Sequence, residues 1–123
     1  MTSVLLKRVY DAPAASDGTR ILVDRLWPRG IAKDKARIDL WLKDIAPSDT
    51  LRKRFHGHPE DWDEFLAAYF AELGSAAAHV AETMIFEHLR DGSVTLLYAA
   101  RDEHHNNAVA LRMWLDRKRN KGG

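Results

Sequence analysis

Two short segments of this sequence place charged side chains directly after apolar stretches. They are DRLWPRG at positions 24–30 and RDEHHNN at positions 101–107. Arginine side chains beside free backbone N–H groups form a good receptor for a phosphate or a carboxylate, because both supply donors to anionic oxygen. These residue types therefore predict a cationic site for a small anionic ligand, in which one acid, Asp24, orients four arginines that hold the anion: Arg25, Arg29, Arg52 and Arg101.

The second segment also contains the two candidates for acid–base chemistry, Asp102 and His105. A histidine beside a carboxylate is a common proton-transfer pair, because imidazole titrates near neutral pH. The position of Asp102 favours a helix cap over a general base, and arginines next to acids also form purely structural salt bridges. The residues alone do not decide between ligand binding and turnover.

Several other chemistries are excluded by the residue types. The 123 residues contain no cysteine, which removes disulfides, thiolate metal sites and cysteine nucleophiles. No glycine-rich nucleotide loop and no G-x-S-x-G nucleophile motif is present, so no particular cofactor is predicted. The six histidines are scattered, and His104 and His105 would face two directions on a helix, so no metal site is expected.

The composition is that of one soluble globular domain covering residues 1–123, with 46% hydrophobic and 30% charged residues. No segment approaches the ~20 apolar residues of a membrane span, and the lack of cysteine and of a secretory leader predicts a cytoplasmic protein. The net charge of +1 gives no general argument for nucleic acid. Two alternatives stay open: a nucleic-acid-binding module using the basic segment 20–37 and the basic tail, and a protein-interaction module using Trp41 and the helix around Trp62.

The hydrophobic pattern predicts the elements that must position these side chains. Strands are expected at 4–9, 20–26 and 94–100, with a weaker one at 38–43. Helices are expected at 48–55, 59–73 and 75–90, and from 102–105 into the basic tail. This order predicts an α/β fold, a single three-layer domain with a small mixed or parallel sheet flanked by helices. Ligands bind beyond the carboxyl ends of strands in such sheets, where both charged segments fall.

The segment RILVDRLWPRG at 20–30, together with WLK at 41–43 and LLYAARD at 96–102, resembles the YeaO-like branch of the domain-of-unknown-function family 488 (DUF488). The similarity covers nearly the whole chain. The family is named for having no assigned activity, so the resemblance implies membership without implying a reaction. Some members resemble proteins labelled as uroporphyrin methyltransferases, but this chain has no glycine-rich loop for a methyl donor.

The chain departs from the family pattern at two places, and it also differs from other branches of the family. Arg101 stands where the family prefers lysine, which keeps the charge and changes the hydrogen-bond geometry. Gly57-His58 replaces the family's His-Asp. Other branches have cysteines after the buried strand, where this chain has Ala99 and Ala100, so the resemblance carries over no thiol chemistry.

Overall fold

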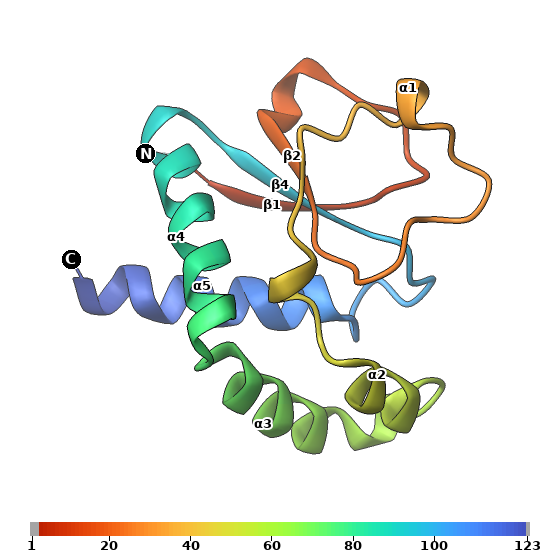
Figure 1. Ribbon diagram of the computed structural model, residues 1–123, viewed down its shortest axis with the longest axis vertical. Helices are drawn as coiled ribbons and strands as arrows, with labels where there is room; N and C mark the ends of the chain where they lie inside the picture. Colours follow the sequence, from red (N-terminus) through yellow and green to blue (C-terminus); the bar gives the residue numbers. More distant parts are fainter. Residues whose placement is uncertain (1–2, 123) are drawn as a thin grey trace.

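The computed structural model, which describes residues 3–122, contains a four-stranded sheet in which all paired strands are parallel. The strands follow the spatial order β1-β4-β2-β3 (Figure 1), with bounds Val4–Arg8 (β1), Val94–Tyr98 (β4), Thr19–Leu22 (β2) and Leu40–Trp41 (β3). All five residues of β4 are buried, as its unbroken apolar sequence predicts for a central strand. The predicted α/β class is confirmed, with the parallel arrangement.

Helices cover one face of this sheet (Figure 1). The α-helices are α1 (Lys33–Ala36), α2 (Asp49–Phe55), α3 (Trp62–Leu73), α4 (Ala76–Asp91) and α5 (Asn107–Gly122), and short 3-10 turns span Ala15–Asp17, Lys43–Ile45 and Pro59–Asp61. The main core joins Ile21 and Leu96 of the sheet to side chains of α3, α4 and α5. No helix in the described part of the chain has the length and apolar character needed to cross a membrane.

The opposite face of the sheet is covered by irregular chain rather than by long helices. Segment 24–39, which includes the single turn of α1, packs Trp27 over Leu22 and Leu97. The Trp27 ring meets the Trp41 ring edge-on, with their centroids 5.4 Å apart. The outer layer on this side is therefore thin. It contains the charged segment 24–30, which begins just beyond the carboxyl end of β2.

Two of the boundaries that differ from the sequence prediction affect the charged segments. Strand β2 ends at Leu22 instead of residue 26, so Asp24 already lies outside the strand. Helix α5 begins at Asn107, later than predicted, because the Asn106 side chain accepts a hydrogen bond from the N–H of Val109 and so caps the helix. Both charged segments consequently consist of irregular backbone at the carboxyl ends of neighbouring strands.

Candidate functional site

Asp24 ties the ends of two neighbouring strands to the start of a helix. Its Oδ2 accepts a hydrogen bond from the backbone N–H of Ala99, just after β4, at 2.9 Å. Its Oδ1 accepts one from the side-chain amide of Asn107, the first residue of α5, also at 2.9 Å. The same amide donates to the carbonyl of Val23 at 2.9 Å. Asp24 and Asn107 together therefore fix the carboxyl ends of β2 and β4 against α5.

The surroundings of Asp24 make its negative charge costly without nearby cations. Burial raises the pKa of Asp24 above its ordinary value, and the hydrogen bonds from Asn107 and Ala99 and the charge of Arg52 oppose that rise. Arg52 thus lies close enough to Asp24 to favour its ionised form. The structure brings these two predicted site residues together.

Arg25 connects the end of β2 to the chain that leads into α2. Its Nε donates to the carbonyl of Pro47 and its Nη2 to the carbonyl of Ala46, both at 3.1 Å. The remaining guanidinium nitrogen, Nη1, donates to none of the described residues. Arg25 is therefore held rigidly by two of its nitrogens and keeps the N–H groups of the third available.

Arg52 lies in the middle of α2, whose N-cap is Ser48, with the hydroxyl of Ser48 accepting from the N–H of Leu51. The Nη2 of Arg52 contacts the carboxylate of Asp49 at 3.3 Å. Its Nε is buried and has no hydrogen-bond partner, and it is the only such buried side-chain nitrogen or oxygen among the described residues. Buried polar groups in folded proteins nearly always have partners, so this donor requires an explanation.

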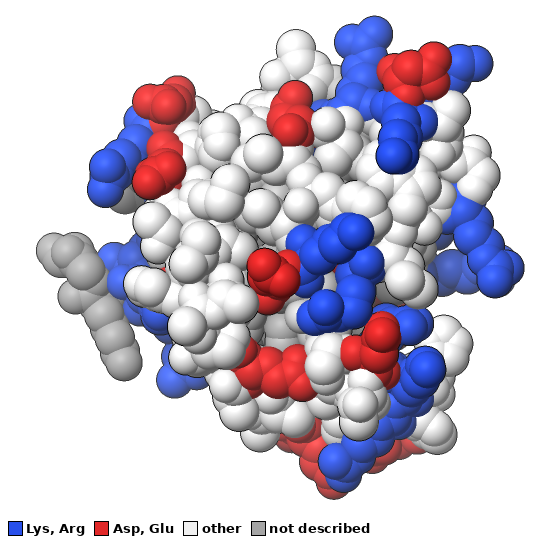
Figure 2. Space-filling model, viewed as in Figure 1, with Lys and Arg blue, Asp and Glu red and all other residues white. Residues whose placement is uncertain are grey.

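The other two predicted arginines do not join this group. Arg29 and Arg101 are exposed, and no hydrogen bond or ion pair among the described residues links either side chain to Asp24, Arg25 or Arg52. Figure 2 shows Lys and Arg side chains gathered in the middle of one face of the molecule, directly beside acidic side chains.

The predicted acid–base pair forms a local structure ahead of α5. The carboxylate of Asp102 accepts from the N–H groups of His104 and His105, at 2.9 and 3.0 Å, and its Oδ2 lies 3.1 Å from Nδ1 of His105. The hydrogen bond from His104 is the main cause that holds the pKa of Asp102 below its ordinary value. The ring of His105 meets the edge of Trp62, with centroids 5.4 Å apart. Both side chains are exposed.

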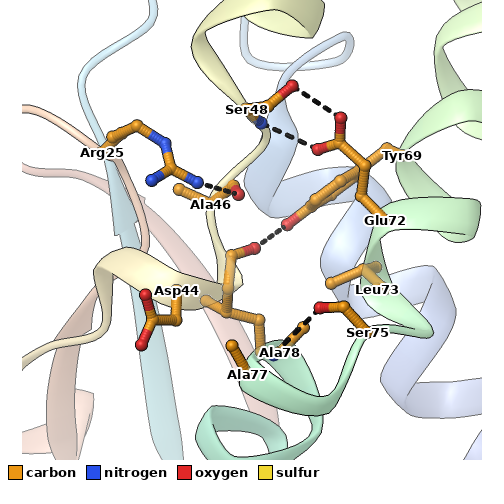
Figure 3. A pocket seen from close by; sticks show the side chains of 11 residues that line it. Arg25, Asp44, Ala46, Ser48, Tyr69, Glu72, Leu73, Ser75, Ala77 and Ala78 are labelled. Carbon is orange, nitrogen blue, oxygen red and sulfur yellow. Dashed lines mark hydrogen bonds between the residues drawn. The ribbon is translucent and has the colours of Figure 1, made fainter.

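Sequence reasoning missed a cavity of about 350 Å³ beside Arg25. Its polar lining residues come from five elements or turns: Arg25, Asp44, Ser48, Tyr69, Glu72 and Ser75. Figure 3 shows Glu72 accepting hydrogen bonds from the backbone N–H of Ser48, at 2.8 Å, and from its hydroxyl, at 2.6 Å. Glu72 follows Tyr69 by three residues and so lies on the buried face of α3. A charged residue on that apolar face is the signal that could have revealed the cavity.

Tyr69 closes the inner side of this cavity. Its hydroxyl donates to the carbonyl of Ile45 at 2.6 Å, which fixes α3 against the Lys43–Ile45 turn. Burial raises the pKa of Tyr69 far above its ordinary value, so its hydroxyl stays protonated.

One group of side chains has the spacing of metal ligands. Donor atoms of His58, Glu60 and Asp61 lie within 4.8 Å of one another at the Pro59–Asp61 turn. His58 and Glu60 are exposed, and Nδ1 of His58 lies 3.0 Å from Glu60 Oε1. Each of these contacts is local, and the three residues do not line the cavity beside Arg25.

The fold and the site define a small α/β protein with arginines and a half-buried aspartate at the carboxyl ends of a parallel sheet. Residues 3–122 match the family described as "Inactive DUF488-N3 subclade", and the chain belongs to this family. The predicted DUF488 resemblance, in its YeaO-like branch, is thereby confirmed.

Two relatives illustrate how far the similarity extends. The chain is 46% identical over 114 residues to "Uncharacterized protein YeaO" of Escherichia coli strain K12, which covers 92% of this chain and 96% of that protein. It is 49% identical over 77 residues to "Uncharacterized protein Rv3073c" of Mycobacterium tuberculosis strain H37Rv, which covers 63% of this chain and 65% of that protein. No solved structure matches the chain.

Proposed function

We propose that this protein binds a small phosphate- or carboxylate-bearing ligand at the carboxyl ends of β2 and β4. The observation that supports this proposal is the buried Nε of Arg52, which has no hydrogen-bond partner. An unpaired buried donor costs about 1–3 kcal/mol. An anionic oxygen bound at this nitrogen would remove that cost, and arginine is well suited to such oxygens because its donors are fixed in a planar fork.

The neighbouring groups support the same ligand class. Arg25 has an unused Nη1, and its other two nitrogens are already held by backbone carbonyls. Asp24 is held by Ala99 and Asn107, so it stays oriented without a ligand. In this proposal Arg25 and Arg52 contact the anion directly. The exposed Arg29 and Arg101 add longer-range attraction that salt screens.

Binding is proposed here without turnover, and the description of the family as an inactive subclade supports this choice. Asp102 and His105 are the proposed proton-transfer pair for any conversion of the bound ligand, because the Asp102 carboxylate orients Nδ1 of His105. Incubation of a ligand that binds, followed by NMR for products, tests this pair directly. Product formation that is lost in His105→Ala would assign the pair a catalytic role.

The test of the binding proposal is isothermal titration calorimetry with inorganic phosphate, sulfate, acetate and propionate. Arg52→Ala should weaken binding at least about tenfold, since a hydrogen bond to a charged group contributes about 1.5–3 kcal/mol. Arg54→Ala is the matched control, because Arg54 lies in the same helix, is exposed, and among the described residues pairs only with Glu64 and the Phe55 ring. Equal affinities in wild type and Arg52→Ala would overturn the proposal, as would the absence of binding to every anion.

A further inference from the structure

The cavity beside Arg25 has the volume of a small-ligand site. Its 350 Å³ correspond to roughly a dozen non-hydrogen atoms, taking about 30 Å³ for each water-sized group. It lies where the Lys43–Ile45 turn, the end of α3 and the start of α4 meet. Figure 3 shows Arg25 and Asp44 on one side of it, with Ser48 and Glu72 on the other.

The charges that line this cavity do not favour a ligand that is anionic throughout. One basic residue, Arg25, faces two carboxylates, those of Asp44 and Glu72. Two negative charges against one positive charge repel a second anionic group and attract a cation. Within this cavity the anionic end of a ligand is therefore favoured at Arg25, and a positive group is favoured toward the carboxylates of Asp44 and Glu72.

Both carboxylates have acceptor capacity for such a positive group. Asp44 is exposed, and its carboxylate forms no hydrogen bond or ion pair with the residues that the structure describes. Each oxygen of Glu72 accepts one hydrogen bond from Ser48. An ionised carboxylate has about four acceptor positions, so Glu72 has two to spare. An ammonium group has three donors and would satisfy acceptors of this kind.

We infer that the ligand is a small zwitterion, whose phosphate or carboxylate meets Arg25 and Arg52 and whose ammonium group lies in the cavity, where the carboxylates of Asp44 and Glu72 attract it. This inference rests on the proposed function, since it assigns the cationic end of the same ligand. Its new content is the substrate class: aminoalkyl phosphates and amino acids of about a dozen non-hydrogen atoms or fewer.

The experiment compares ligands that differ only in the ammonium group. Calorimetric titrations of the full chain use 2-aminoethyl phosphate against ethyl phosphate, and β-alanine against propionate. In at least one pair the zwitterion should bind about tenfold more tightly, which is about 1.4 kcal/mol. Asp44→Asn should lower this preference, because the ammonium group loses the attraction of one of the two carboxylates. Asp91→Asn, an exposed acid at the far end of α4, is the control and should keep the preference.

The outcomes separate the inference from the proposed function. Equal affinity for zwitterion and simple anion in both pairs would overturn the zwitterionic ligand and leave anion binding standing. A preference of unchanged size in Asp44→Asn would overturn the placement of the ammonium group in this cavity. Failure of all four compounds to bind would overturn both proposals. Asp44 makes no side-chain bond to the described residues, so loss of folding in Asp44→Asn is not expected.

Discussion

Replacing Asp24 with alanine should destabilise the protein, because this carboxylate joins two strands to a helix. The substitution removes the acceptor of the Ala99 N–H and that of one side-chain N–H of Asn107. The Asn107 amide keeps its other bond, to the carbonyl of Val23. Two donors therefore lose their partners at the carboxyl ends of β2 and β4.

The magnitude follows from these two bonds. Each stranded donor costs about 1–3 kcal/mol, so two donors cost about 4 kcal/mol together. Part of this cost is offset, because Asp24→Ala also removes a charge whose burial raises the pKa of the carboxyl. The expected net loss in the free energy of unfolding is about 2 kcal/mol at neutral pH. For a domain of 123 residues this corresponds to a fall in Tm of about 8 °C.

Urea denaturation at pH 7, followed by circular dichroism, measures this loss. Asp44→Ala is the matched control, since the Asp44 carboxylate has no hydrogen-bond partner among the described residues, and it should change the free energy of unfolding by less than about 0.5 kcal/mol. If Asp24→Ala behaves like Asp44→Ala, then Asp24 does not hold the strand ends together and the reasoning is refuted.

The pH dependence of the stability difference between wild type and Asp24→Ala gives a second, independent test of the role of Asp24. Burial raises the pKa of Asp24 above 3.8 in the folded state, so the folded protein binds this proton more tightly than the unfolded chain. The contribution of this proton to the stability of the fold is fully present below pH 3.8, and it is lost as the pH rises through the pKa of Asp24 in the folded protein. The advantage of wild type over Asp24→Ala should therefore be larger at acidic pH than at pH 7, and the opposite trend would contradict this assignment.

Two further predictions concern the amino ends of β2 and β4. Gly18 has a φ of +65°, and a Cβ there would lie 2.0 Å from the carbonyl oxygen of Ser93. Gly18→Ala should therefore lower the free energy of unfolding, measured in urea, by about 3 kcal/mol. An unchanged midpoint of urea denaturation would contradict this. Burial by itself raises the pKa of Asp17. The hydrogen bonds from Lys7 and Arg20 act in the opposite direction, and the pKa of Asp17 in the folded protein lies below 3.8. Asp17 thus stabilises the fold above pH 3.8 and loses that contribution as the pH falls through its lower folded pKa, so Asp17→Asn should show a shallower loss of stability on acidification.

The sequence was sufficient to predict that the two charged segments follow the carboxyl ends of strands. The buried run of β4 and the abrupt end of β2 before Trp27-Pro28 are strong local signals. Parallel neighbours place their carboxyl ends at one edge of a sheet, which brings Asp24 next to Ala99. This part of the site depends on local patterns and on a general rule of α/β folds.

The cavity could not be predicted in the same way, because distant segments form it. The alternation at 38–43 predicts a strand, but only Leu40 and Trp41 pair with β2, and Lys43–Ile45 forms a turn. Period-two alternation does not distinguish an edge strand from an extended segment that ends in a turn. The position of Asp44 opposite Glu72 depends on how α3 packs against that turn, through the bond from Tyr69 to Ile45, and no local pattern specifies this contact.

Asp24 and Arg25 also explain why the proposed site needs little rearrangement to bind. These adjacent residues bond in different directions, Asp24 to the start of α5 and Arg25 to the carbonyls that precede α2. The end of β2 is therefore fixed against two helical regions before any ligand arrives. A receptor held in this way loses less conformational entropy on binding, which leaves more of the interaction energy as affinity. Asp24→Ala should accordingly weaken anion binding without removing an arginine, so stability and affinity should fall together in this variant.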